Sequence, residues 1–131
     1  MLDKPQVHLT LAEAVSLCAE WQKILRLQDW VVEVKIARGN GIDLSPACMG
    51  DVTSNPKRKM ALIKLLDPND WDRNIMVPQD MEVTLVHELL HLQCRGFDYL
   101  IKDDSPEDTG YEQMIILTSH ALVYLRRAGA Q

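Results

Sequence analysis

The amino-acid sequence predicts a single α+β domain over residues 1–131, with one helix, three strands and two further helices in that order. Apolar residues recur at helical spacing at the start and in the second half, whereas the segment between them has the short apolar and alternating runs of strands. The chain is 47% hydrophobic and 25% charged, an ordinary balance for a globular domain that buries one core. We therefore expect a small three-stranded sheet packed on helices.

The first helix is predicted to begin after Thr10, because Thr10 and Glu13 form the pattern of a capping box. The helical spacing continues over 11–27 and places an apolar stripe on one side, from Ala14 to Leu25. This stripe is expected to pack into the core.

Three strands are predicted after this helix, at 30–37, 48–54 and 59–66. The first alternates apolar and charged residues, as a half-buried strand does. The other two flank the turn Asn55-Pro56 and are predicted to form a hairpin. The glycine-containing segment 38–47 is expected to be a mobile loop beside a site, and 67–74 a loop or one short helical turn.

Two helices are predicted in the second half of the chain. The segment 79–95 is apolar on nearly every side, which indicates a buried helix, and Gly96 is placed to end it. The last helix is predicted over 106–127, because Ser105 is a good cap and Pro106 suits a first turn.

Charge and composition exclude several classes of partner. The net charge is −5, whereas a nucleic-acid-binding surface is basic, so no nucleic acid is expected. No apolar run is long enough to span a membrane, and the first residues lack the core of a signal peptide. Three cysteines at no recognisable spacing do not predict a disulfide framework. A cytoplasmic protein is the simplest expectation.

The predicted buried helix carries three titratable residues, His87, Glu88 and His91, in the pattern H-E-x-x-H. Burying an unpaired polar side chain costs about 1–3 kcal/mol, and a bound cation would compensate these groups together. Residues four apart share a helical face, so His87 and His91 can both bind one zinc ion per chain. Glu88, one position further round, can act as the general base toward water that the zinc activates.

A third ligand is expected from the last helix. Glu112 shares a face with apolar residues there, and a carboxylate on a packing face requires a partner. His120 is the alternative ligand, or a residue that supports the site without binding the metal. Cys94 is expected to be a buried thiol, and the acidic residues of 103–108 are expected to be solvated.

The H-E-x-x-H pattern at His87–His91 resembles that of the zincin metallopeptidases. A following helix that carries a glutamate, Glu112, is similar to the arrangement of a small, minigluzincin-like gluzincin. The chain also resembles compact SprT-like metallopeptidases of phage or prophage type. The resemblance implies a zincin-like fold with the sheet packed on the H-E-x-x-H helix, His87, His91 and Glu112 as ligands, and Glu88 as base. It further implies that extended substrate pairs with an edge strand, which by position comprises Cys48, Met49, Gly50, Asp51, Val52 and Thr53.

The sequence thus predicts a zinc-dependent peptidase acting on a peptide or protein substrate. The alternative is a binding or regulatory module in which zinc only holds two helices together, although Glu88 would have no use in such a site. A group that stabilises the oxyanion formed at the scissile carbonyl is also expected. The candidates for this role are Tyr99, Tyr111, Tyr124 and His120.

Overall fold

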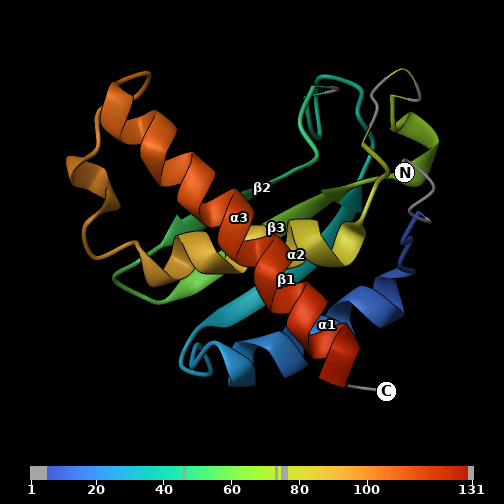
Figure 1. Cartoon of the computed structure of the whole chain (residues 1–131), viewed down its shortest axis with the longest axis horizontal. Coiled ribbons are helices and arrows are strands. Elements are labelled where there is room, and N and C mark those ends of the chain that lie inside the picture. Colours follow the sequence, from blue (N-terminus) through green and yellow to red (C-terminus); the bar gives the residue numbers. More distant parts are fainter. Residues whose placement is uncertain (1–5, 46, 73, 75–76, 130–131) are drawn as a thin grey trace.

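The computed structural model describes residues 6–45, 47–72, 74 and 77–129 (Figure 1). It has the predicted mixed class, with three α-helices and one three-stranded sheet. The elements in chain order are α1 (Leu11–Ile24), β1 (Val31–Ala37), β2 (Gly50–Asn55), β3 (Met60–Leu66), the 3₁₀ helix η1 (Pro68–Asp70), α2 (Met81–Gln93), the 3₁₀ helix η2 (Asp98–Leu100) and α3 (Pro106–Gly129).

The capping box at the start of α1 is confirmed. The Thr10 hydroxyl accepts a hydrogen bond from the Glu13 amide at 3.2 Å, and the Glu13 carboxylate accepts one from the Thr10 amide at 2.9 Å. The helix ends at Ile24, three residues earlier than predicted, because Arg26 adopts a left-handed conformation with φ +62°. Gln22 then holds the turn into β1 by donating to a main-chain oxygen at Trp30, at 2.8 Å.

The sheet has the order β1-β3-β2, with β1 parallel and β2 antiparallel to β3. The hairpin is confirmed, and β2 lies at an edge of the sheet. The edge strand predicted to begin at Cys48 was placed too early, since β2 begins at Gly50 and continues to Asn55. Both residues precede the strand. The Cys48 amide donates to the Ser45 carbonyl, and the Met49 carbonyl accepts from the Leu66 amide.

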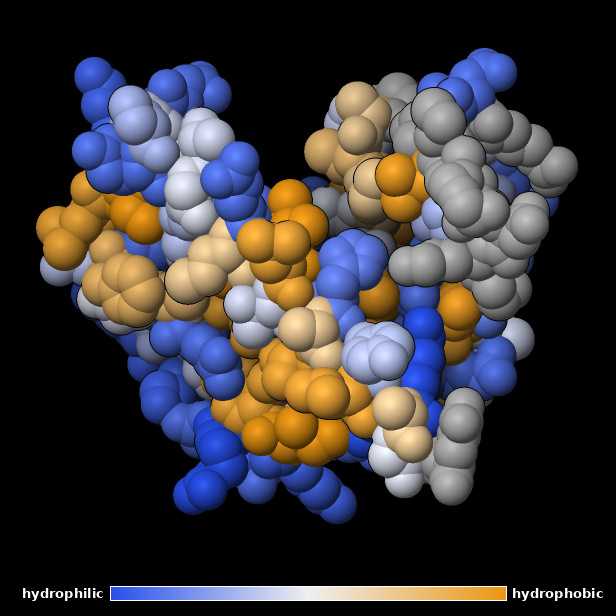
Figure 2. All heavy atoms as spheres, viewed as in Figure 1, coloured by the Kyte–Doolittle hydropathy of each residue, from blue (hydrophilic) through white to orange (hydrophobic). Residues whose placement is uncertain are grey.

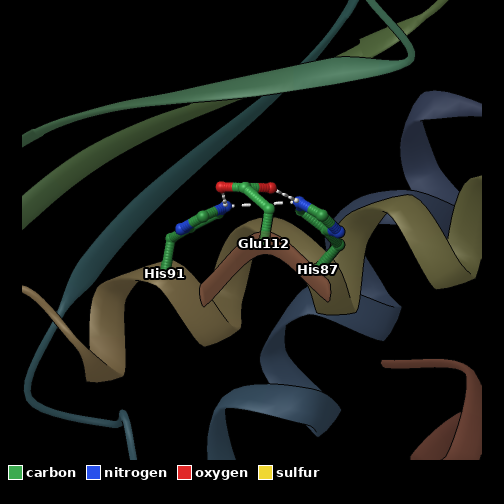
Figure 3. Close-up of side chains that lie close together, drawn as sticks. All are labelled: His87, His91 and Glu112. Carbon is green, nitrogen blue, oxygen red and sulfur yellow. Dashed lines mark hydrogen bonds and ion pairs between the residues drawn. The ribbon is translucent and has the colours of Figure 1, made fainter. Parts of the chain in front are cut away.

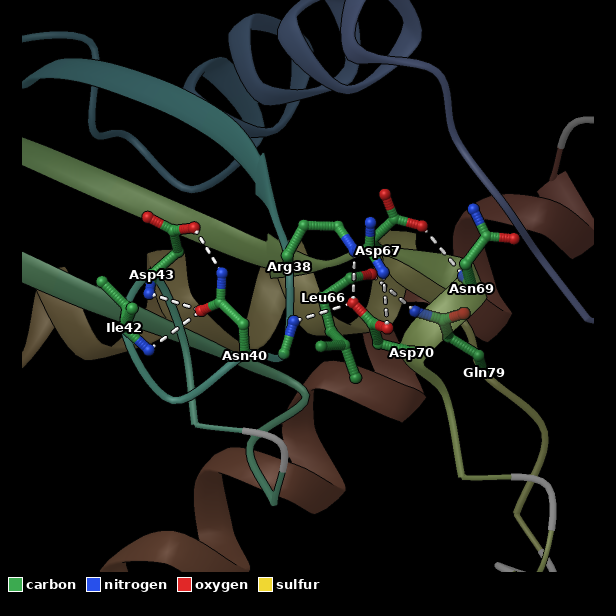
Figure 4. Close-up of polar contacts among 10 residues, drawn as sticks. Arg38, Asn40, Ile42, Asp43, Leu66, Asp67, Asn69, Asp70 and Gln79 are labelled. Atoms are coloured by element: carbon green, nitrogen blue, oxygen red, sulfur yellow. Dashed lines mark hydrogen bonds and ion pairs between the residues drawn. The ribbon is translucent and has the colours of Figure 1, made fainter.

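The loop after β1 is fastened to η1 by polar contacts (Figure 4). Arg38 donates to both oxygens of the Asp70 carboxylate at 2.6 and 3.1 Å, and the Gly39 amide donates to the same carboxylate at 2.8 Å. Gly41 has φ +81°, a conformation that favours glycine. Of the two predicted loops, Pro46 and Arg73 lie outside the described residues.

Helix α2 lies at the centre of the molecule, between the sheet, α1 and α3. Leu85, Val86 and Leu89 are fully buried, as an all-round apolar helix predicts. Asp80 caps its start by accepting from the Val83 amide. The helix ends at Gln93, before Gly96, which has no left-handed conformation, so the predicted glycine stop is wrong.

Helix α3 crosses in front of α2 in Figure 1 and is capped by Ser105, whose hydroxyl accepts from the Asp108 amide at 3.1 Å. Its inner side buries Ile115, Ser119 and Val123. Apolar side chains also gather on the face shown in Figure 2, and the exposed apolar residues of α3 are Met114, Ile116, Leu117, Tyr124 and Leu125. Among the described residues, no helix has both the length and the apolarity to cross a bilayer.

Candidate metal centre

His87 and His91 lie one turn apart on α2, and Glu112 of α3 brings its carboxylate over both imidazole rings (Figure 3). The two histidine Nε2 atoms are 3.2 Å apart. The Glu112 oxygens lie 3.5 Å from Nε2 of His87 and 3.3 Å from Nε2 of His91. The three side chains therefore form a group that can hold a metal ion.

The separations of these donor atoms fit a tetrahedral ion. Zinc binds nitrogen and carboxylate oxygen at about 2.0–2.2 Å, so two ligands at the tetrahedral angle are about 3.3–3.6 Å apart. The two nitrogens are 3.2 Å apart, and each lies at a similar distance from its own Glu112 oxygen, 3.3 Å from Oε1 for His91 and 3.5 Å from Oε2 for His87, which is close to that spacing. Three protein ligands would leave one position of a tetrahedral ion for water, as in catalytic zinc sites, and the three residues line the cavity.

The electrostatics of the group favour a bound cation. Burial, followed by the charge of His120, lowers the pKa of His87. Burial, followed by the charges of His87 and Arg95, lowers the pKa of His91 to about 4. Both rings are therefore neutral near pH 7 and ready to bind metal, so their contacts with Glu112 are not ion pairs. Burial, and then the charge of Asp108, raises the pKa of Glu112, and a cation would reverse that effect.

Glu88 lies next to this group, on the same helix, and only 6% of it is exposed. Its carboxyl lines the same cavity as the two histidines. Burial is the largest cause that raises its pKa to about 8, and the charges of Asp51 and Glu112 add to the increase. A buried acid whose pKa is moved toward neutrality, beside a metal-ligand group, is a candidate for proton transfer.

The cavity has a volume of about 450 Å³ and is open to solvent. Its walls are the start of β2 from Gly50 to Val52, the metal-ligand face of α2, and part of the segment 98–112. Gly50 is required there by close packing, because a Cβ would lie 2.7 Å from the Lys64 carbonyl oxygen and 2.7 Å from the Thr84 methyl. Asp103 and Asp108, expected only to be solvated, also line the cavity.

The other candidate residues lie outside the metal-ligand group. His120 is exposed on α3 and is not part of the group, although its charge acts on His87. Cys94 is buried, as expected, and burial raises its pKa. Tyr99 and Tyr124 are 76% and 72% exposed, and neither lines the cavity.

Tyr111 has a contact that the sequence did not predict. Its hydroxyl lies 3.0 Å from Nδ1 of His91, the ring nitrogen that faces away from Glu112, and donates to Asp98 at 3.2 Å. The Tyr111 hydroxyl is therefore already hydrogen-bonded on the side of His91 that faces away from Glu112. Tyr111 directly precedes Glu112, but no local pattern shows that its hydroxyl reaches a helix 20 residues away.

Comparisons of the chain with protein-family models, with curated proteins and with solved structures find no match in any of the three.

Proposed function

We propose that the protein is a zinc-dependent metallopeptidase with a zincin-like fold, which hydrolyses peptide bonds in a peptide or protein substrate. The observation that carries the proposal is the group of His87, His91 and Glu112, whose two Nε2 atoms are 3.2 Å apart and lie 3.5 and 3.3 Å from the two oxygens of the Glu112 carboxylate. Its separations suit zinc, and buried Glu88 lines the same cavity. A site that only stabilised the fold would not need this fourth group.

Nε2 of His87, Nε2 of His91 and a carboxylate oxygen of Glu112 would hold the ion. When bound, zinc supplies a Lewis acid that polarises a carbonyl and activates water at neutral pH. Glu88 would take a proton from the attacking water at its carboxylate and return it to the departing amine. Positive charge at the three ligands favours the ionised form of Glu88 and so offsets the increase in pKa that burial causes.

The edge strand β2 is the proposed docking site for the substrate backbone. The sheet order pairs β2 with β3 on one side only, and in Figure 3 a strand crosses above the metal-ligand group. An extended peptide can add to such an edge through main-chain hydrogen bonds. The start of β2 lines the cavity, so a peptide paired there would pass over the ligands and Glu88.

Cleavage of a fluorescently labelled unfolded protein by zinc-loaded protein tests the proposal. Glu88→Gln is expected to slow cleavage about 10²–10⁴-fold, the usual contribution of a general base, while zinc content stays at one per chain. Glu33→Gln, on an exposed residue of β1, is the matched control and should cleave normally. Cleavage unaffected by Glu88→Gln would refute the role of Glu88. Zinc binding without cleavage by the wild type would refute the peptidase and leave a zinc-stabilised binding module.

A further inference from the structure

A chain of hydrogen bonds leads away from the metal-ligand group behind His91. Nδ1 of His91 contacts the Tyr111 hydroxyl at 3.0 Å, and that hydroxyl donates to Oδ2 of Asp98 at 3.2 Å. The same carboxylate oxygen is paired with Arg95. Arg95 in turn donates through Nε to the Ser54 hydroxyl of β2 at 2.9 Å. The chain thus joins α2, η2, α3 and the edge strand.

The direction of these bonds follows from the charges. Arg95 has only donors, and an ionised carboxylate has only acceptors, so Asp98 accepts from both Arg95 and Tyr111. The Tyr111 hydroxyl donates its one proton to Asp98, so in its contact with His91 the Tyr111 oxygen can only be the acceptor. His91 must therefore carry its proton on Nδ1. Its Nε2 is left with the lone pair, directed at His87 and Glu112.

We infer that Tyr111 is a positioning residue, which fixes the tautomer and ring orientation of His91 for metal binding. The inference rests on the proposed zinc site. Tyr111 also packs against the ring of His91, with centroids 5.4 Å apart and an interplanar angle of 69°. Asp98 sets the direction of the Tyr111 hydroxyl, and Arg95 holds Asp98 in place while it bridges to β2. A hydrogen bond to the far ring nitrogen of a histidine ligand raises its basicity and fixes its orientation.

The two histidines differ in this support. Among the described residues, no hydrogen bond is found for Nδ1 of His87, whereas Nδ1 of His91 has Tyr111. The same hydroxyl is engaged by both His91 and Asp98, so Tyr111 is not placed to stabilise an oxyanion. Its expected effect is on the affinity and geometry of the metal.

Tyr111→Phe removes the hydroxyl and keeps the ring, so it tests the inference directly. Titration with zinc sulfate against a chromophoric chelator should give an affinity about 10–100-fold weaker than that of the wild type. Tyr124→Phe makes the same chemical change at an exposed position of the same helix and should leave the affinity unchanged. Urea unfolding of the metal-free proteins shows whether any loss of affinity comes from a loss of fold.

The tautomer of His91 gives a readout that a purely structural role would not change. The chain has four histidines, so long-range ¹H–¹⁵N spectra of the metal-free protein are simple to assign. The wild type should show His91 protonated on Nδ1, and Tyr111→Phe should shift it toward protonation on Nε2. Asp98→Asn, which keeps the shape but removes the charge, should weaken zinc binding by a smaller factor and serves if Tyr111→Phe does not fold.

Equal zinc affinity and an unchanged His91 tautomer in Tyr111→Phe would overturn the inference while the zinc site stands. A wild type that binds no zinc would instead refute the proposed function. The two failures are therefore distinguishable.

Discussion

The buried carboxyl of Glu88 should make the stability of the metal-free protein depend on pH between about 4.5 and 8. Its pKa is raised to about 8 in the folded protein, mainly by burial, from a model-compound value of 4.5. Between these values the folded protein holds a proton that the unfolded chain has lost. The free energy of unfolding therefore decreases as the pH rises, and this contribution is complete below pH 4.5 and lost as the pH passes 8.

The histidines act in the opposite direction and over a lower range. The pKa of His91 is lowered to about 4, so its contribution to stability increases with pH and is complete by about pH 6.5. The interval from pH 6.5 to 8 therefore lies above the pH range in which the histidines chiefly act. One pKa unit corresponds to about 1.4 kcal/mol, so the titration of Glu88 across that interval should cost about 1.5–2 kcal/mol.

Glu88→Gln removes the titrating group and keeps its size. Urea unfolding with a chelator present, at pH 6.5 and pH 8, should show the wild type losing about 1.5–2 kcal/mol more than Glu88→Gln over this step. Glu33→Gln, at an exposed position, should behave as the wild type. Because Glu112 and all other groups are common to these proteins, the difference between them belongs to Glu88. An identical pH dependence in wild type and Glu88→Gln would refute the reasoning.

Three further predictions follow from the packing of the site. Glu112→Ala should lose the zinc found in the wild type, whereas His120→Ala should retain it, as elemental analysis of the purified proteins will show. Gly50→Ala should lower the free energy of unfolding by about 1–3 kcal/mol and reduce cleavage, because a Cβ would meet the Lys64 carbonyl of β3 and the Thr84 methyl of α2. Thr53→Ala, at an exposed position of the same strand, is the control in urea unfolding. Arg127→Ala leaves the buried carboxylate of Glu82 without its cation and should destabilise the protein by about 1–3 kcal/mol, measured as a lower melting temperature. Arg58→Ala, in the exposed hairpin, should change the melting temperature little.

The elements and the juxtaposition of His87 and His91 could be predicted because their signals are local. The capping box at Thr10, the alternation over β1 and the four-residue spacing of His87 and His91 depend on neighbours in the sequence. Glu112 was predicted by a different argument, namely that a carboxylate on a packing face needs a partner. The structure places it within 3.5 Å of both histidine Nε2 atoms.

The remaining features depend on contacts between distant segments. The parallel pairing of β1 with β3 joins segments that lie on either side of β2 in the sequence, and Gly50 at the start of β2 packs closely against Thr84 of α2. No single segment encodes either feature. The Tyr111 contact with His91 likewise requires the crossing of α3 over α2. The early end of α1 has a local cause, the left-handed conformation of Arg26, but arginine gives no sequence signal for it.

The pKa values of His91, Glu88 and Glu112 are shifted in opposite directions by one cause, and a bound cation would suit all three residues. Burial disfavours the charged form of every group, so it lowers the pKa of His91 and raises the pKa values of Glu88 and Glu112. A cation placed between the Nε2 atoms and the Glu112 carboxylate would bind the neutral imidazoles, which the lowered histidine pKa provides. It would also favour the ionised forms of Glu88 and Glu112 and so offset their raised pKa values. The burial of Glu88 would also strengthen the attraction between such a cation and the Glu88 carboxylate. The proposed metal affinity and the basicity of Glu88 would thus both depend on the burial of these side chains, and a substitution that exposes them further should weaken both together.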